Sequence, residues 1–277
     1  MARYDLHAHT NRSDGTFTPT ELVDLAVERG LSGVAITDHD TLAGLDEAIG
    51  AAHARIEVVP GIEFSAEYEG ASLHVLAYWI DPADDALRAE LRRLTDTRFR
   101  RGELMIEKLQ ELGYPIDFER VRRIAGGDTI ARPHVAQAMV EAGIVPNEKA
   151  AFTDEFIADG GRAWVPKHAL HPLDALTLIA SAGGVCVLAH PGMWKGAGSV
   201  PDGLIESMAT GGMAGLEVEH PDHDEGQRAK YRAMAARLDL VPTGGSDCHG
   251  LRYDPVRLAS EATDTDHFAQ LRARAGR

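Results

Sequence analysis

Short apolar runs alternate with segments of helical periodicity along most of the chain. Segment 18–30 illustrates the pattern: Thr18 and Pro19 suit a helix start, a glutamate three residues after Thr18 completes a capping box, and Gly30 ends the apolar stripe. The surrounding pattern predicts strands at 4–10, 33–37 and 57–63 and a second helix at 42–55. Strands that alternate with helices in this way favour a parallel sheet with helical crossovers.

The periodicity changes after a further apolar strand, which we predict at 71–80. From 82 to 113, leucines and isoleucines recur at helical spacing until Gly113 and Pro115 interrupt them. Shorter helical pieces are predicted at 117–125, 133–142 and 148–158. The sequence therefore predicts a helical insertion, residues 81–165, within an α/β domain formed by residues 1–80 and 166–277.

The alternation of strands and helices resumes in the last third of the chain. We predict strands at 184–189, 215–219 and 240–243, and helices at 225–238 and after Asp264. In parallel barrels the reactive residues gather at the C-terminal ends of the strands. Polar residues that follow these strands are therefore candidates for a functional site.

Composition narrows the class of protein. The chain has 277 residues, 44% of them hydrophobic, which suits a globular protein with a substantial core. No apolar run approaches the roughly 20 residues needed to span a bilayer, and a strand is predicted at the N-terminus, so we expect no signal peptide and a cytoplasmic protein. The net charge of −15 argues against binding to long duplex nucleic acid, although it is compatible with a small anionic substrate.

Histidines and carboxylates recur where the predicted strands end. Side chains two positions apart on a strand point the same way, so His7 and His9 form half of a metal site unless they are a pair of surface histidines. The full set of candidate metal ligands is His7, His9, Asp14, His39, Glu63, His74, His190, Asp247 and His249.

Imidazoles and carboxylates without thiolates suit zinc, manganese or iron. Nine groups exceed the needs of one ion, so we predict two or three divalent ions. Three carboxylates would offset only half the charge of three ions. The resulting positive pocket favours an oxyanion, and phosphate esters are the expected substrate class.

These motifs resemble those of the polymerase and histidinol phosphatase (PHP) family. The matching pieces, in the family's order, are Asp5-Leu6-His7-Ala8-His9, Ser13-Asp14-Gly15, Thr37-Asp38-His39-Asp40, Gly61-Ile62-Glu63, His74, Ala189-His190-Pro191 and Ser246-Asp247-Cys248-His249. The resemblance implies a distorted (β/α)7 barrel, related to that of the amidohydrolases, with a polynuclear metal site.

The resemblance also implies how the ligands divide among three ions. One ion would be held by His7, His9, Glu63 and Asp247, a second by Glu63, His74 and His190, and a third by Asp14, His39 and His249. A carboxylate at position 14 resembles the branch of the family that cleaves nucleotides more than the branch that acts on histidinol phosphate.

The predicted insertion contains Arg132-Pro133-His134 at a helix start. A helix N-terminus attracts anions, and Arg132 and His134 would add donors there, although an ordinary helix start with a solvent-facing arginine has the same pattern. The element resembles that of PHP enzymes acting on nucleoside 3′,5′-bisphosphates and on the 5′ ends of short RNAs. We therefore expect loss of the 3′-phosphate from a bisphosphate, and stepwise trimming of short RNA in the same pocket.

Two other readings stay open. The substrate could be another small ester, such as histidinol phosphate or a cyclic nucleotide. The chain could instead be a metal-stabilised module without catalysis, but such a module is expected to lack some of the nine ligands.

Several weaker candidates remain. Lys167 is a candidate phosphate ligand, and His223, favoured over His220, is expected to face the pocket. Either His134 or His223 could protonate the leaving oxygen, or a metal ion could bind it instead. Arg98 and Arg101 are expected to lie on a solvated helix face rather than at a second phosphate.

Overall fold

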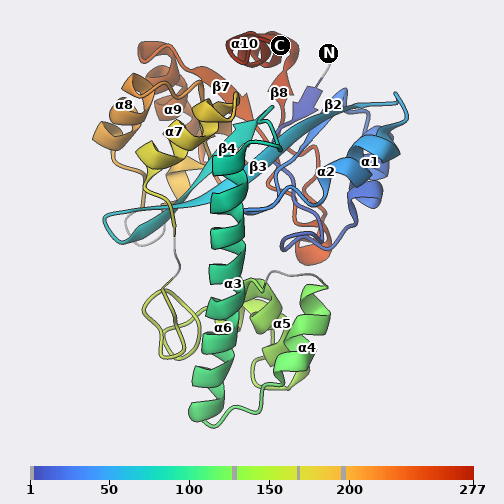
Figure 1. Ribbon diagram of the computed structural model, residues 1–277, viewed down its shortest axis with the longest axis vertical. Coiled ribbons are helices and arrows are strands. Elements are labelled where there is room, and N and C mark those ends of the chain that lie inside the picture. The colour runs from blue at the N-terminus through green and yellow to red at the C-terminus, as the bar shows by residue number, and fades with distance from the viewer. Residues whose placement is uncertain (1–2, 127–129, 167–168, 195–197) are drawn as a thin grey trace.

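A computed structural model describes residues 3–126, 130–166, 169–194 and 198–277 (Figure 1). Within these residues, eight strands form one sheet. The strands are β1 (Arg3–Asp5), β2 (Gly33–Ile36), β3 (Glu57–Tyr68), β4 (Ala71–Tyr78), β5 (Val185–Leu188), β6 (Gly215–Glu219), β7 (Val241–Gly244) and β8 (Thr263–Asp264).

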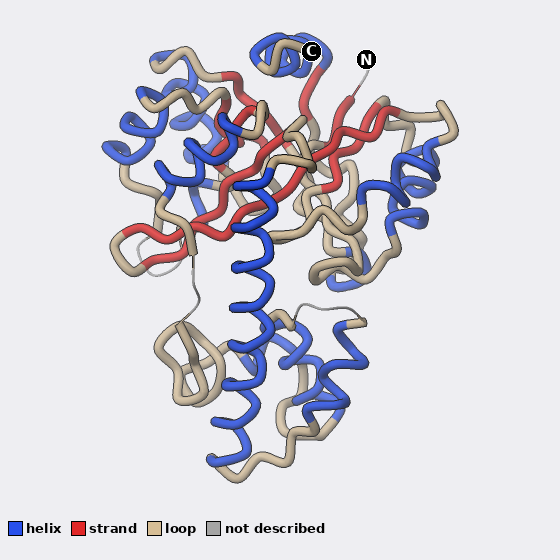
Figure 2. Tube along the Cα trace, viewed as in Figure 1, coloured by secondary structure: helices blue, strands red, loops and turns tan. Residues whose placement is uncertain are grey.

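Helices cover the outside of the sheet and form a separate group below it (Figures 1 and 2). The α-helices are α1 (Pro19–Glu28), α2 (Leu45–Ala52), α3 (Asp85–Glu111), α4 (Phe118–Ala125), α5 (Arg132–Glu141), α6 (Glu148–Ala151), α7 (Pro172–Ser181), α8 (Asp202–Thr210), α9 (Glu225–Arg237) and α10 (Thr265–Arg274). Two short 3-10 helices follow strands, at Pro191–Met193 and Gly250–Arg252.

The strand order is β7-β6-β5-β4-β3-β2-β1-β8. Strands β1, β2 and β3 are parallel, as are β5, β6 and β7, in agreement with the predicted crossovers. Strand β4 is antiparallel to both β3 and β5, which the strand–helix rhythm did not predict. The reason is local: β3 and β4 are joined by a tight turn at Glu69 and Gly70, with no helix between them.

Contacts between the two ends of the sheet nearly close it into a barrel. The Leu6 amide after β1 donates to the Gly244 carbonyl of β7 at 3.3 Å, and the Thr263 hydroxyl of β8 accepts from the Gly244 amide at 2.8 Å. Helix α10 covers one end of this barrel through Phe268 and Leu271, opposite the end that faces α3–α6 (Figure 1). The mixed α/β barrel with surrounding helices confirms the predicted fold class.

Helix α3 connects two hydrophobic cores. Leu87 and Leu94 in its first half pack into the core beside β3–β6, whereas Met105 and Leu109 in its second half pack with α4 and α5 in a core of their own. This separate core supports the predicted insertion at 81–165. Its boundaries stay a prediction.

Most predicted elements are present within a few residues of the expected bounds. The Thr18 side chain and Glu21 form the predicted capping box of α1. One prediction is wrong in detail, because the helix expected at 148–158 ends at Ala151. Helix α8 and strand β8 were not predicted from the sequence. None of the helices within the described residues is both long and apolar enough to cross a membrane.

Candidate metal centre

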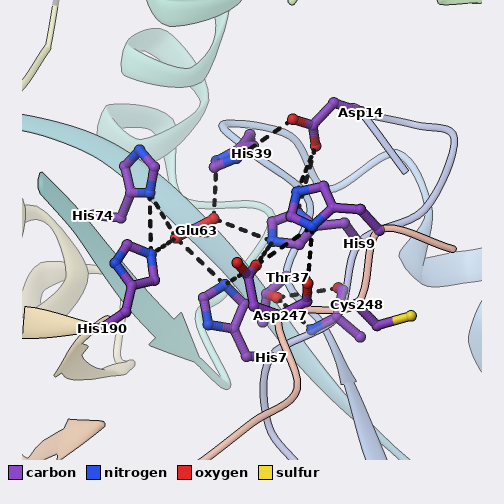
Figure 3. Close-up of polar contacts among 12 residues, drawn as sticks. His7, His9, Asp14, Thr37, His39, Glu63, His74, His190, Asp247 and Cys248 are labelled. Atoms are coloured by element: carbon purple, nitrogen blue, oxygen red, sulfur yellow. Dashed lines mark hydrogen bonds and ion pairs between the residues drawn. The ribbon is translucent and has the colours of Figure 1, made fainter. Parts of the chain in front are cut away.

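All nine predicted ligands lie around one space at the barrel end that faces α3–α6 (Figure 3). His7, His9, Asp14, His39, His190, Asp247 and His249 follow strands, as expected. Glu63 and His74 differ, because they lie inside β3 and β4. Strand β3 pairs with parallel β2 only as far as Pro60 and with β4 from Gly61, so Glu63 still lies just beyond the parallel part of the sheet.

Glu63 lies at the centre of this group. Its Oε1 atom is 2.9 Å from His74 Nδ1, 3.2 Å from His190 Nε2 and 3.4 Å from His7 Nε2. The His74 and His190 nitrogens are 3.4 Å apart. A carboxylate oxygen surrounded by three imidazole nitrogens at these distances is a candidate metal ligand.

The second oxygen of Glu63 faces a different pair of histidines. Its Oε2 atom is 2.9 Å from His39 Nδ1 and 3.3 Å from His9 Nε2. Asp247 Oδ1 approaches the same region, 3.2 Å from His9 Nε2 and 3.4 Å from His7 Nε2. His7, His9, Glu63 and Asp247 thus lie close together, and they are the four residues that the family resemblance assigns to one ion.

Asp14 forms the far side of the cluster. Its carboxylate oxygens lie 3.3 Å from His249 Nε2 and 3.8 Å from His39 Nε2. His9 Nδ1 is 3.9 Å from the same carboxylate, so His9 lies between the Asp14 group and the Glu63 group.

Five buried nitrogen and oxygen atoms in this cluster have no hydrogen-bond partner within the described part of the chain: His7 Nε2, both ring nitrogens of His9, His39 Nδ1 and Glu63 Oε2. Unpaired buried polar atoms are costly, so their concentration in one place indicates bound cations. The nitrogen and oxygen donors fit zinc, manganese or iron.

The electrostatics of the cluster also favour cations. Burial alone would raise the pKa of Glu63, but the charges of His74 and His39 hold it well below its usual range. Burial alone would lower the pKa of His9, but its contacts with Asp247 and Glu63 outweigh burial and raise the pKa to about 10. The carboxylates therefore attract positive charge, which protons supply to His9 when no metal is bound.

Glu217 of β6 is a functional candidate that the sequence analysis missed. Its Oε1 atom is 3.0 Å from His7 Nδ1, and its Oε2 atom accepts from the His190 amide at 2.7 Å. A proton on His7 Nδ1 leaves Nε2 with a lone pair directed at the cluster. The available signal was a glutamate placed between the apolar residues Leu216 and Val218.

An unusual backbone conformation at the strand ends sets the orientation of two of the ligands. His190 and Asp247 have φ values of 25° and 48°, a region that costs most side chains about 1–3 kcal/mol. Gly245 allows the end of β7 to approach β1, because a Cβ atom there would lie 2.4 Å from His7 Cβ. Such strain is typical of residues held in place for function.

A cavity of about 590 Å³ opens from the cluster toward α3–α6. One wall carries the predicted ligands Asp14, His39, Glu63, His74, His190, Asp247 and His249. The remaining lining, which we call the cationic wall, contains Arg98, Arg101, Arg132, Lys149 and Arg252 together with the Glu148 carboxylate. This arrangement suits an anion with one group at the cluster and another at the arginines.

The start of α5 contributes to the cationic wall. Arg132 Nη1 donates to Asp159 at 2.8 Å, and the His134 ring accepts from the Ala131 amide through Nδ1 at 3.2 Å. Burial lowers the pKa of His134 to about 4, so this ring is neutral near pH 7 and carries its proton on Nε2.

The other candidates differ from the sequence expectation. Arg98 lines the cavity and is only 13% exposed, so the prediction of a solvated helix face is wrong for it; Arg101 also lines the cavity and is half-buried. Lys167 lies outside the described residues.

The structure places His220, rather than His223, beside Asp247, with His220 Nε2 at 3.6 Å from Asp247 Oδ2. His223 uses both ring nitrogens on the backbone, donating from Nδ1 to the Val218 carbonyl at 2.9 Å and accepting from the Gly192 amide at 3.2 Å.

Comparison with known proteins decides the family. Residues 5–115 match the model of the PHP domain. The chain is 34% identical to a 3′,5′-nucleoside bisphosphate phosphatase of Chromobacterium violaceum, over 90% of this chain and 88% of that protein. The chain belongs to the PHP family. It is a metal-dependent hydrolase of phosphoric esters, as the resemblance implied.

Other PHP relatives are named for different activities. A 5′-3′ exoribonuclease of Haemophilus influenzae is 33% identical over 89% of this chain and 90% of its own length. A phosphoribosyl 1,2-cyclic phosphate 1,2-diphosphodiesterase of Eggerthella lenta is 33% identical over 89% and 94%. A solved structure from Bifidobacterium adolescentis, described as a metal-dependent phosphoesterase, is 36% identical with a TM-score of 0.92, covering 98% of this chain and 96% of that one.

Proposed function

We propose that this PHP enzyme removes the 3′-phosphate from nucleoside 3′,5′-bisphosphates and trims short RNA from its 5′ end. The supporting observation is a cavity that is lined both by the ligand cluster and by the cationic wall. A substrate with two phosphates matches both walls. The activities for which the Chromobacterium and Haemophilus relatives are named support this substrate class, and a cytoplasmic location would suit it.

The nine ligands are proposed to hold three divalent ions, manganese, zinc or iron, in the groups implied by the family resemblance. The short distances around Glu63, Asp247 and Asp14 support this division. When bound, such ions activate water and neutralise charge on the phosphoryl oxygens.

The chain's own residues are proposed to bind and orient the substrate. Arg132 offers a planar set of donors to a phosphate, at the cost of its pairing with Asp159. His134 is neutral, which favours a hydrogen-bond donor over an acid that gives up a proton. His223 makes two hydrogen bonds to the backbone, which favour a role in positioning the loop after β6 over a role as the acid. Lys167 stays a candidate phosphate ligand.

Phosphate release from adenosine 3′,5′-bisphosphate tests the proposal. Purified protein loaded in turn with manganese, zinc and iron should release inorganic phosphate and leave adenosine 5′-monophosphate. A panel with histidinol phosphate, a cyclic nucleotide and a 1,2-cyclic ribose phosphate compares the other ester classes. Turnover of a panel ester at a higher kcat/KM, or absence of turnover of the bisphosphate with every metal, would contradict the proposal.

A further inference from the structure

Arg101 lies in the middle of α3, where it faces the cavity. Its Nε atom donates to the Val165 carbonyl at 2.7 Å, which fixes the guanidinium beside the segment after α6. The Nη1 and Nη2 atoms make no hydrogen bond to any residue that the structure describes. Four N–H groups of a half-buried guanidinium are therefore available to a bound molecule.

Arg101 also differs from its neighbours in charge pairing. Arg98, Arg132 and Arg252 each contact a carboxylate, at 2.5, 2.8 and 2.7 Å. Within the described ranges, no carboxylate lies within the 4 Å of an ion pair with Arg101. Arg101 is thus a half-buried cation of the cavity wall that makes no direct ion pair among the described residues, and the Asp159 carboxylate acts on it only from a greater distance.

Such a charge is costly to bury. Burial, together with the nearby charges of Arg132 and Arg98, lowers the pKa of Arg101 to about 10, so the side chain remains cationic near pH 7. A guanidinium that is already partly stripped of water and faces unpaired into a cavity binds an anion more strongly than an exposed one. Arg101 and Arg132 also line a second, smaller hollow beside Ser72 and Trp164, so neither is covered on its cavity side.

We infer that Arg101 binds the substrate phosphate that is not hydrolysed and so selects substrates with two anionic groups. This inference rests on the proposed function and adds to it the residue that recognises the second phosphate. The alternative is a structural one, in which Arg101 only holds the Val165 segment against α3.

The variant Arg101→Gln separates the two roles, because glutamine keeps a hydrogen-bond donor for the Val165 carbonyl but removes the charge. Arg100→Gln is the matched control: Arg100 is the preceding residue of the same helix, is exposed, and pairs with Glu103 instead of facing the cavity. Each protein is assayed with manganese on adenosine 3′,5′-bisphosphate and on adenosine 3′-monophosphate, which lacks the second phosphate.

Arg101→Gln should lower kcat/KM for the bisphosphate by about 10- to 100-fold, the loss expected for a charge-assisted hydrogen bond, and change that for the monophosphate by less than about threefold. Arg100→Gln should match the wild type on both. Equal losses on both substrates would overturn the inference in favour of the structural role. Wild-type protein that turns over both substrates equally would also overturn it and leave the phosphatase proposal standing.

Binding of adenosine 5′-monophosphate gives a readout that does not depend on turnover. This ligand carries only the second phosphate, and calorimetry should show an affinity about 10-fold or more lower for Arg101→Gln than for the wild type. Unchanged affinity would overturn the inference. Wild-type protein that hydrolyses neither phosphate ester would overturn the proposed function together with the inference that rests on it.

Discussion

Glu217 contacts two candidate ligands without facing the cavity itself. Its carboxylate holds the His7 ring through Nδ1 and the backbone of His190. Groups that orient a ligating histidine in this way commonly affect metal affinity by about 10- to 100-fold. Glu217 is therefore predicted to affect metal affinity although it is not itself a candidate ligand.

Glu217→Gln should weaken manganese binding by about 10- to 100-fold, because the amide can present a donor where His7 and His190 need an acceptor. Calorimetric titration of the metal-free protein measures the change. Glu225→Gln, at the exposed start of α9, is the control and should bind manganese like the wild type. Unchanged affinity in Glu217→Gln would contradict the assigned role.

Asp14→Ala should reduce phosphate release by about 100-fold or more, since this carboxylate is the negative partner of the His39 and His249 group. The metal-free variant should still fold, because Asp14 lies at the cavity and not in a core, and circular dichroism checks this. The exposed Asp46→Ala serves as the control. Full activity without Asp14 would argue against the third ion.

Metal binding should release protons. The pKa of His9 is about 10 without metal, against an ordinary value of 6.5, so His9 is protonated at pH 8 and must lose its proton to bind an ion. Affinity should therefore rise with pH toward 10. Calorimetric enthalpies in buffers of different ionisation enthalpy measure the release, and identical enthalpies would contradict it. In the metal-free protein, the same shift stabilises the fold below about pH 6.5, and this stability is lost as pH rises toward 10.

The sequence identifies candidate ligands better than it identifies the residues that orient them. His7 and His9 are recognisable because their spacing places both on one side of a strand. Glu217 looks like an ordinary strand residue, since only the three-dimensional pairing of β5 with β6 brings it under His190. The environment of Arg98 was mispredicted because a helix with charged residues on most sides gives no sign of which side another domain will cover.

At the scale of elements, α3 leads out of the barrel and also contacts it through a side chain from its middle. Arg98 in its middle reaches back to the loop after β2, donating to Asp40 at 2.5 Å and to the Ser65 hydroxyl at 2.6 Å. Asp40 follows His39, and Ser65 is two residues from Glu63, so this contact connects the predicted insertion to two candidate ligands.

Arg98→Met should lower the free energy of unfolding by about 3 kcal/mol, because it removes a guanidinium that forms an ion pair with the buried Asp40 carboxylate. Urea denaturation of the metal-free protein measures the loss. Arg92→Met, at an exposed position of the same helix, should change stability by no more than about 0.5 kcal/mol. A loss as small as that of the control would show that the ion pair contributes little.

Element order was predictable because hydrophobic periodicity is local, and strand direction was not. The β3–β4 hairpin depends on a turn at Glu69 and Gly70. The apolar pattern of the two strands is the same whether a hairpin or a longer crossover connects them. Strand β8 has two residues, too few for any periodicity, and is defined by its pairing with β1.

At the scale of the whole molecule, the centre joins both ends of the barrel sheet. Ions that bind only the folded state stabilise it, by about 2.7 kcal/mol at 100 times the dissociation constant. Removing the metal with a chelator should therefore lower Tm by about 5–10 °C, and added manganese should restore it. Differential scanning fluorimetry checks this, and an unchanged Tm would contradict a shared metal centre.

The closure of the barrel also has a consequence for biosynthesis. His7 and His9 follow the first strand, whereas Asp247 and His249 follow the seventh, and the proposed centre needs all four. A ribosome makes the chain from its N-terminus, so all the residues from His7 to His249 must emerge before the last ligands can join the first. Nascent chains that stop short of β7 would therefore lack the complete centre, and cellular nucleotides would meet a working enzyme only after that strand had been made and had joined the sheet.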